Sequence, residues 1–303
     1  MKKLFAALVC LIQILSMGVV AYGQVSVPVK VLVVIAHPDD ETTFAATIYK
    51  ITHELKGTVD LLLVTNGEGG YKYSTLAEPI YGVELTDEKI GRKELPKIRK
   101  KELKNAGKII GIRKFFFLEQ KDAHYTTDEH EPLDTSWNVQ LVMKKMNDVI
   151  TKNKYDMIFC LLPDPGTHGG HKAATLLALR TVKEMPFAQR PIILGVTDTD
   201  KNDTTKNKFM QLKEYSETKL RTGLAPFQVD RSTKFGFKRS LDYHVIVNWE
   251  IAEHRSQGTM QLAMNKGDLE NFWYFELNGD AGLEKCKNLF DQLKNVPYKT
   301  KTY

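Results

Sequence analysis

The stretch VLVVIAHPDDE, residues 31–41, combines the features that determine the fold class. Its first six residues are apolar and mostly β-branched, which is typical of a strand buried on both faces of a sheet. Polar residues begin directly after this run, with Pro38 in the turn. From Glu41 an amphipathic pattern continues to residue 55 and predicts a helix. A buried strand that leads through a short turn into a helix is the unit of parallel α/β sheets.

The same strand–helix unit recurs along the chain. Further apolar runs of strand type lie at residues 60–65, 115–118, 156–162 and 191–196. Helical patterns separate them, at residues 41–55, 88–110, 139–152 and 171–183. We therefore predict a Rossmann-like α/β fold, with a mostly parallel sheet and helices on both faces in a single domain. Such sheets bind ligands at the carboxyl ends of their strands, near the point where the strand order reverses.

The last third of the chain has a less regular pattern. Residues 198–237 are rich in Lys, Asp and Thr and predict either an excursion of the chain close to the substrate or a surface loop with a short helix. Beyond them, the pattern favours a strand at 243–248, a helix at 249–264 and a late strand at 272–277. No internal repeat or low-complexity linker interrupts the sequence, which favours one domain.

The composition is that of a folded globular protein. The 303 residues are 42% hydrophobic, 26% charged and 10% aromatic, which excludes disordered, collagen-like and coiled-coil classes. The formal net charge of +6 is spread along the chain, so charge gives no indication of nucleic-acid binding.

The first 23 residues have the pattern of a secretory signal peptide. Two lysines precede an apolar run over residues 4–20, and the small residues Ala21 and Gly23 fit a cleavage site. We therefore predict a domain over residues 24–303, a secreted or periplasmic location, and no stable membrane span. The alternative is an uncleaved membrane anchor, for which the run is shorter than the roughly 20 apolar residues that a span needs.

A histidine and two adjacent aspartates follow the first predicted strand. His37 and Asp40 are three residues apart, so a turn after Pro38 would let both approach one cation. Asp39 would then point elsewhere and remain free as a base. The alternative is a plain helix N-terminus, where an aspartate caps backbone N–H groups and His37 lies at the surface.

A second polar loop, PDPGTHGGH at residues 163–171, follows the predicted strand 156–162. His168 and His171 can share one helix face, although two solvated histidines in a flexible loop are the alternative. If both loops meet, His37, Asp40 and one histidine of this pair would form the three-ligand set of a catalytic zinc site. Zinc lowers the pKa of bound water to about 7, and the other histidine would steady an oxyanion or protonate a leaving amine.

Six ordered motifs resemble those of the PIG-L/LmbE-like zinc deacetylases, a family that includes N-acetylglucosaminyl deacetylases. The most specific is AHPDDE at residues 36–41. The others are TNGEGG at 65–70, RKKEL at 99–103, Asp122 after the third strand, HGGH at 168–171, and the late H-x-S-Q motif around His254. The resemblance spans residues 31–257 and includes most of the chain.

The resemblance implies a role for each residue of the first and fifth motifs. His37, Asp40 and His171 would hold one Zn²⁺, for which Fe²⁺ could substitute. Asp39 would be the general base. His168 would stabilise the tetrahedral intermediate or assist departure of the amine.

The other motifs imply contacts with substrate. Arg99 and Asp122 would bind substrate hydroxyls, and His254 would line the site. A helix-surface ion pair with Glu102 is the alternative for Arg99. The family usually has Asp where this chain has Gly170. Loss of such a partner commonly costs about 10- to 100-fold in affinity or activity, and Asp164 is a candidate substitute.

The resulting hypothesis is a secreted zinc-dependent deacetylase that hydrolyses the N-acetyl amide of an amino sugar or glycan. An amidase for a non-sugar N-acyl substrate and a non-catalytic glycan-binding protein on the same scaffold remain open as alternatives. Tyr71 and Tyr73 are candidates for stacking on a sugar ring. No nucleic-acid partner is expected, and the sequence does not specify an oligomeric state.

Overall fold

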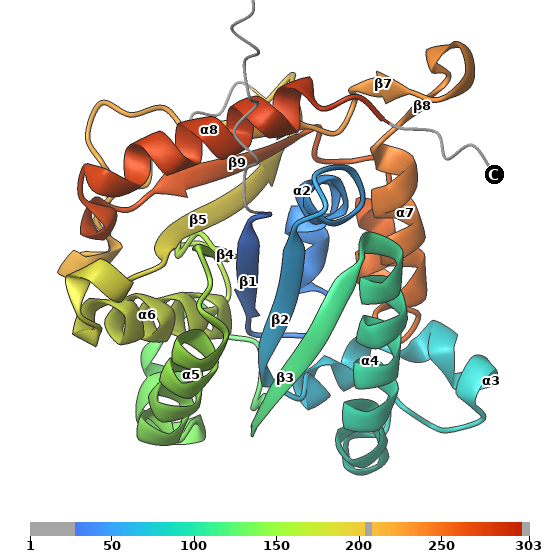
Figure 1. Cartoon of the computed structure of the whole chain (residues 1–303). Coiled ribbons are helices and arrows are strands. Elements are labelled where there is room, and N and C mark those ends of the chain that lie inside the picture. Colours follow the sequence, from blue (N-terminus) through green and yellow to red (C-terminus); the bar gives the residue numbers. More distant parts are fainter. Residues whose placement is uncertain (1–27, 204–207, 299–303) are drawn as a thin grey trace, which may run out of the picture.

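The computed structural model describes residues 28–203 and 208–298, and within them a seven-stranded sheet forms the centre of the molecule (Figure 1). In spatial order the strands are β3 (Ile112–Gln120), β2 (Thr58–Thr65), β1 (Lys30–Ile35), β4 (Met157–Leu161), β5 (Ile192–Thr199), β9 (Leu269–Tyr274) and β6 (Phe227–Asp230). The strands from β3 to β5 are parallel, and β9 runs antiparallel to both β5 and β6. The predicted fold class is confirmed: the sheet is mostly parallel and belongs to a single domain.

The strand order reverses between β1 and β4. From β1 the chain adds β2 and β3 on one side, and it then returns to add β4 and β5 on the other side. At such a reversal the loops leaving the two central strands diverge and leave a crevice at the carboxyl edge of the sheet. The two loops that carry the predicted ligands follow β1 and β4, so the topology places both at this crevice.

Helices cover both faces of the sheet (Figure 1). One face carries α2 (Ala45–Tyr49), α4 (Glu88–Ile110), α7 (His244–Glu253) and α8 (Ala281–Asn295), and the other carries α5 (Val139–Asn153) and α6 (Gly169–Glu184). Successive residues of β1 divide between the two cores: Val33 packs on the first face and Val34 on the second. Both are at most 1% exposed, as an unbroken apolar run predicts for a central strand.

Two elements near the end of the chain differ from the prediction. The segment predicted as a strand at 243–248 belongs to α7, and the predicted helix at 249–264 ends at Glu253, with a 3₁₀ segment at Gly258–Ala263 beyond it. The run of β-branched residues favours a strand locally. The buried side chains of α7 recur with helical spacing, and they are Ile246, Val247, Glu250 and Ile251.

The irregular region contains more strand than the sequence indicated. Besides β6, it leads into a short antiparallel hairpin formed by β7 (Lys234–Phe235) and β8 (Leu241–Asp242). A short helix, α3 (Glu78–Tyr81), lies between β2 and α4 in the chain. The late strand β9 begins three residues earlier than predicted.

The C-terminal strand β9 stabilises the segment that follows β1. Glu270 is fully buried and accepts the N–H groups of Ala46 and Thr47, each at 2.9 Å, and Nε of Arg231 at 2.9 Å. Arg231 also donates from Nη2 to the carbonyl of Thr42 at 2.8 Å. A buried carboxylate is stable only with paired donors, and here those donors tie the start of α2 and the preceding 3₁₀ turn η1 (Asp40–Phe44) to the sheet.

The predicted signal peptide, residues 1–23, lies outside the described residues. Among the residues that the structure describes, no helix has the length and apolar character to cross a membrane.

Candidate active site

The loop after β1 folds around the carboxylate of Asp40. Oδ2 of Asp40 accepts the backbone N–H groups of Ala36 at 3.0 Å and His37 at 2.8 Å. The other oxygen, Oδ1, lies 3.0 Å from Nε2 of His171. Asp40 is therefore not an ordinary helix cap, because it closes its own turn and presents one oxygen to the loop after β4.

His37, Asp40 and His171 come together at the crevice. The ring centroids of the two histidines are 5.0 Å apart, and one donor atom from each of the three residues lies within 4.8 Å of the others. Nδ1 of His171 contacts Oγ1 of Thr167 at 3.0 Å, which leaves Nε2 facing the carboxylate. Two imidazole nitrogens and a carboxylate oxygen are donors that zinc and iron(II) accept, so this set fits a divalent metal ion.

Asp122 approaches His37 from the other side. Its Oδ1 lies 3.7 Å from Nε2 of His37, and its Oδ2 accepts the N–H of Gly69 at 3.1 Å. Together with His168, these two residues form a second group whose donor atoms lie within 4.8 Å of one another. A carboxylate behind a ligating imidazole fixes its tautomer and strengthens it as a ligand. Asp122 is therefore placed to orient His37.

The carboxylates around His37 favour positive charge at this point. Burial alone would disfavour the imidazolium, but Asp122 and Asp40 outweigh it and raise the pKa of His37 to about 10. Although burial opposes the change, His37 lowers the pKa of Asp122 below its usual range, and His171 with His37 holds the pKa of Asp40 well below its usual range. A divalent cation satisfies the same preference, in competition with the proton.

His168 is the N-cap of α6 and is fixed in one tautomer. Its Nδ1 accepts the N–H of Gly170 at 2.9 Å. Because a backbone amide can only donate, Nδ1 carries no proton and Nε2 carries it in the neutral ring. Burial, His37 and His171 lower the pKa of His168 to about 3. The neutral ring meets that of His37 edge-on, with centroids 4.6 Å apart, and so lies beside the candidate ligands.

Glycine at position 170 has a steric reason. A Cβ at Gly170 would lie 3.0 Å from Nδ1 of His168 and 3.1 Å from Cε1 of His37. A side chain at this position would therefore require one of the two rings to shift by a few tenths of an ångström, and the N–H of Gly170 supplies the polar partner of His168. The suggested substitute, Asp164, instead accepts the N–H of Gly166 at 2.9 Å within its own turn.

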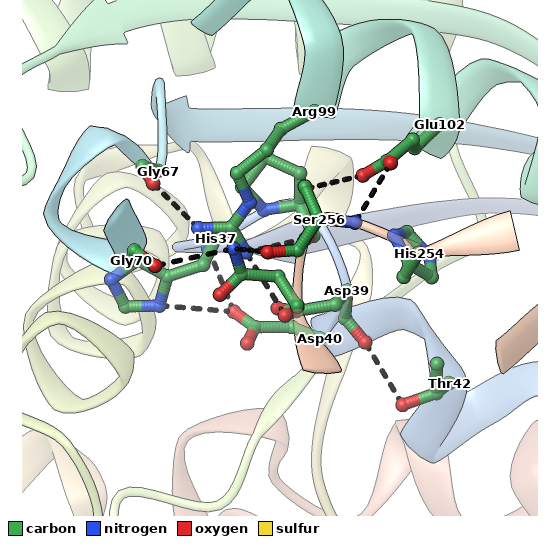
Figure 2. Close-up of polar contacts among 12 residues, drawn as sticks. His37, Asp39, Asp40, Thr42, Gly67, Gly70, Arg99, Glu102, His254 and Ser256 are labelled. Atoms are coloured by element: carbon green, nitrogen blue, oxygen red, sulfur yellow. Dashed lines mark hydrogen bonds and ion pairs between the residues drawn. The ribbon is translucent and has the colours of Figure 1, made fainter. Parts of the chain in front are cut away.

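Arg99 is held beside Asp39 rather than at the helix surface. The guanidinium donates to the carbonyls of Gly67 at 2.6 Å and Pro38 at 2.7 Å, and to Oδ2 of Asp39 at 2.9 Å (Figure 2). A Cβ at Gly67 would lie 2.5 Å from Nη1, and its φ of 71° also favours glycine. Within the described part of the chain, Arg99 forms no ion pair with Glu102, and most of its donors bind the protein itself.

Glu102, one turn further along α4, binds the loop after α7. Its carboxylate accepts the N–H of Ser256 at 2.9 Å and the hydroxyl of Ser256 at 2.5 Å (Figure 2). It also accepts the hydroxyl of Tyr81 at 2.7 Å. The late H-x-S-Q motif is thus not a helix, as predicted, but the turn that follows one. Through Arg99 and Glu102, helix α4 joins the first and last motifs.

His254 lies behind the cavity and not in it. Its side chain is fully buried, and Nε2 lies 2.7 Å from Oε1 of Glu41. The other oxygen of Glu41 accepts the N–H of Asp39 at 3.0 Å. The structure therefore places His254 out of reach of substrate and connects it to Asp39 through Glu41.

A cavity of about 400 Å³ opens over these groups, a size typical of small-molecule sites. Every predicted site residue except His254 lines it. Tyr73 also lines the cavity, whereas Tyr71 is buried beneath the loop. Sequence reasoning missed Tyr125, which is 66% exposed and places its ring 5.0 Å from that of His168. Its loop has no periodic pattern or motif that could have indicated it.

Comparison with known proteins relates the chain to a family and to two named sequences. Residues 32–182 match the model of the PIG-L family, described as GlcNAc-PI de-N-acetylase. A Bacillus cereus protein named "Probable N-acetyl-alpha-D-glucosaminyl L-malate deacetylase 2" is 32% identical over 170 residues, which cover 56% of this chain and 68% of the relative. A Bacillus subtilis protein of the same name is 24% identical over 193 residues, covering 63% of this chain and 78% of the relative.

Solved structures with a similar fold include enzymes of two reaction classes. The A40926 pseudoaglycone deacetylase Dbv21 has a TM-score of 0.55 and 16% identity, covering 82% of this chain and 98% of that one. GalB, the 4-carboxy-2-hydroxymuconate hydratase from Pseudomonas putida, has a TM-score of 0.51 and 12% identity, covering 81% of this chain and 95% of that one. Because a deacetylase and a hydratase share the fold, the reaction has to be argued from the site residues.

Proposed function

Because this chain belongs to the PIG-L family of de-N-acetylases, we propose that it hydrolyses the N-acetyl amide of an amino sugar or glycan, releasing acetate and the free amine. One observation carries the proposal. A three-donor metal set, an adjacent carboxylate and a neutral imidazole with a defined N–H all face one cavity. A protein that only binds glycans has no need of these three groups together.

We assign His37, Asp40 and His171 as the ligands of one divalent ion, zinc in first place and iron(II) as the alternative. When bound, such an ion acts as a Lewis acid that polarises the acyl oxygen and makes water acidic enough to attack near neutral pH. Asp122, whose Oδ1 lies 3.7 Å from Nε2 of His37, orients that imidazole through its charge.

Asp39 is the general base in this proposal. Burial raises the pKa of its carboxyl although Arg99 opposes the change, which strengthens the carboxylate as a proton acceptor. Arg99 engages Oδ2, and among the described residues Oδ1 has no hydrogen-bond partner. Oδ1 is therefore available to take a proton from the attacking water and to return it to the amine nitrogen as the amide bond breaks.

His168 stabilises the charge that develops on the acyl oxygen. Its Nδ1 is occupied by the N–H of Gly170, so its Nε2–H is the donor that remains for an oxyanion. A donor that is already fixed in place needs no reorganisation during the reaction.

The cavity mouth supports a sugar as the substrate. Tyr73 and Tyr125 lie at the edge of the cavity with their rings partly exposed. Tyrosine rings stack on the C–H face of a pyranose and leave its hydroxyls for polar partners. The names of both Bacillus relatives also specify an N-acetylglucosaminyl group.

We further propose that the enzyme is exported and acts as a secreted or periplasmic protein. Support comes from the charged and apolar pattern of residues 1–23 alone. This proposal is tested by N-terminal sequencing of the protein after expression in a host that exports it. We expect a new N-terminus near Gln24. A mature protein that still begins at residue 1 would contradict processing.

The function is tested by acetate release after metal removal and re-addition. Metal-free protein is reconstituted with Zn²⁺ or Fe²⁺ and given N-acetylglucosaminides and non-sugar N-acyl amides. Asp39→Asn is expected to keep one ion per chain and to lose about 10²- to 10⁴-fold in kcat. The matched control is Asp164→Asn, which alters a nearby loop carboxylate that does not line the cavity.

Each alternative function has its own outcome in this experiment. Acetate release from non-sugar amides alone would identify an amidase of another substrate class. Tight glycan binding without acetate release from any compound, in the metal-loaded protein, would identify a binding protein on the same scaffold.

A further inference from the structure

A buried imidazole–carboxylate pair supports Asp39 from behind the cavity. We propose that Glu41 and His254 are positioning residues, which hold Asp39 in the conformation that lets it act as the base. The inference rests on the proposed function of Asp39. Neither Glu41 nor His254 lines the cavity, so they act through Asp39 and not on a substrate.

Asp39 has a backbone conformation that a residue with a side chain rarely adopts. Its φ is 142°, and such a conformation persists only where surrounding contacts impose it. Three contacts fix three different parts of the residue. Its N–H donates to Oε2 of Glu41 at 3.0 Å, its carbonyl accepts the hydroxyl of Thr42 at 2.9 Å, and its Oδ2 accepts from Arg99 at 2.9 Å.

Glu41 supplies the contact to the amide of Asp39. Its side chain is fully buried, with Oε2 bound to Asp39 and Oε1 lying 2.7 Å from Nε2 of His254. A charged carboxylate is retained in such an environment only with a charged or hydrogen-bonding partner. His254 therefore determines whether Glu41 remains a strong acceptor for the N–H of Asp39.

His254 in turn connects the pair to α7. It follows the last helical residue, and its N–H donates to the carbonyl of Ile251 at 3.0 Å. Glu250, one turn earlier, has Oε1 3.7 Å from Nε2 of His254. Burial and the charge of Glu41 raise the pKa of Glu250 well above its usual range.

The polar groups of this cluster are incompletely satisfied. In the described residues, both carboxyl oxygens of Glu250 and Nδ1 of His254 are buried without a hydrogen-bond partner. A partly satisfied buried network is less favourable for folding than apolar packing. Stability alone therefore does not account for these three side chains, whereas a role in holding Asp39 does.

A metal ion is the other occupant that this cluster suggests, since donor atoms of Glu41, Glu250 and His254 lie within 4.8 Å of one another. The distances favour the hydrogen-bonded pair. Nε2 of His254 and Oε1 of Glu41 are 2.7 Å apart, the separation of a direct hydrogen bond, and none of the three residues lines the cavity. A second ion is therefore an outcome that the test must distinguish.

Kinetics of single variants provide the first test. Glu41→Ala is expected to lower kcat about 10- to 100-fold with metal content unchanged, and KM is expected to stay within about twofold. His254→Asn is expected to lower kcat by a similar factor. Glu41→Gln keeps an oxygen acceptor for the N–H of Asp39 and is expected to recover part of the loss.

A double-mutant cycle tests whether Glu41 acts through Asp39. In an Asp39→Asn background, Glu41→Ala is expected to cause less than about a twofold further loss, because the residue it positions no longer functions. The same fold loss in both backgrounds would overturn the proposal. Asp60→Asn is the matched control: it removes a carboxylate that is equally buried, bound to Arg113 and Tyr155 at the opposite end of β2. That variant is expected to lower Tm without changing kcat.

A crystal structure of Glu41→Ala, or of Glu41→Gln if the first variant does not fold, gives a readout independent of activity. We expect Asp39 to leave the positive-φ region and to lose its contact with Arg99. If Asp39 moves but the wild type hydrolyses no amide, the proposed function fails and the positioning role stands. If Asp39 keeps its conformation, the positioning role is overturned. Two metal ions per wild-type chain that fall to one in His254→Asn would also overturn it, in favour of a second metal site.

Discussion

The N–H of Gly170 lies 2.9 Å from Nδ1 of His168, so a backbone amide and not a side chain determines which nitrogen of this imidazole carries the proton. A carboxylate in that place would stabilise the imidazolium, because it accepts from a protonated nitrogen. An amide can only donate, and it therefore favours the neutral ring. His168 is consequently suited to donate a hydrogen bond and poorly suited to carry a positive charge.

Introducing a side chain at position 170 is expected to damage the site. Gly170→Ala adds a Cβ about 3 Å from both histidine rings, and such overpacking displaces the groups around it. Gly170→Asp adds the same crowding together with a charge. We expect kcat/KM to fall about tenfold or more in both variants.

Gly166→Ala is the control for this prediction. A Cβ at Gly166 meets its nearest side-chain atom, Oδ1 of Asp164, at 3.4 Å, which is an ordinary contact. Its kcat/KM is expected to match that of the wild type. Wild-type or higher activity in Gly170→Asp would show that the two rings have room to adjust and that the steric argument is wrong.

Metal affinity is expected to rise with pH. Because Asp122 and Asp40 raise the pKa of His37 to about 10, the metal must displace a proton from this imidazole at any lower pH. One displaced proton corresponds to about a tenfold gain in affinity per pH unit. Asp40 and Asp122 have lowered pKa values and add no further proton near neutrality.

Competition with a chelating dye between about pH 6 and about pH 9, corrected for protonation of the dye, measures this slope. Asp122→Asn removes the charge that contributes most to raising the pKa of His37, and it is expected to flatten the slope. A metal affinity independent of pH in the wild type would contradict the charge distribution described for the site.

Arg99 is expected to affect kcat more than KM. Arg99→Ala frees Oδ2 of Asp39 and leaves the carbonyls of Gly67 and Pro38 without their donor. Each unpaired buried group costs about 1 to 3 kcal/mol, so Tm is also expected to fall. Arg99→Lys is expected to recover little, because one ammonium cannot reproduce the planar fork that reaches all three acceptors.

Steady-state kinetics distinguish this role from direct substrate binding. A large rise in KM with unchanged kcat would assign Arg99 to the substrate hydroxyls, as the family resemblance implies. Arg113→Ala is a suitable control, since this arginine pairs with Asp60 at the far end of the sheet. It is expected to affect stability alone.

Tyr125 is expected to contribute to substrate affinity through its ring. Tyr125→Ala should raise KM about three- to tenfold, which corresponds to about 1 kcal/mol of stacking. Tm should not change, because the side chain is 66% exposed. Tyr125→Phe keeps the ring and should keep the KM of the wild type.

The control for stacking is Phe187→Ala, which removes an aromatic ring that is 62% exposed and does not line the cavity. Equal losses in Tyr125→Phe and Tyr125→Ala would mean that the hydroxyl, and not the ring, contacts the substrate.

The sheet and the meeting of its two loops could be predicted from the sequence because both depend on short-range patterns and one topological rule. An apolar run such as residues 31–36 is buried on both sides only in a central strand. His37 follows that run, and His171 opens the helix after the neighbouring strand β4. Their proximity then follows from the reversal of strand order, without any knowledge of side-chain contacts.

The contacts of Arg99 and His254 could not be predicted in the same way. Arg99 reaches Asp39 because Gly67, on a different loop, leaves room for its guanidinium. His254 turns toward Glu41 because α7 packs beside η1. Both depend on how distant segments pack, and spacing along a single helix carries no information about that.

The contacts of Glu270 and Arg231 have a practical consequence for shortened forms of this protein. Both residues lie beyond residue 182, where the match to the family model ends, yet they secure Ala46 and Thr42 beside the HPDDE turn. A recombinant fragment limited to residues 32–182 would lose these contacts. It would also lose β5, which leaves β4 as an unpaired, apolar edge strand of the sheet. Such edges recruit other chains, so the shortened fragment should precipitate where the longer polypeptide folds.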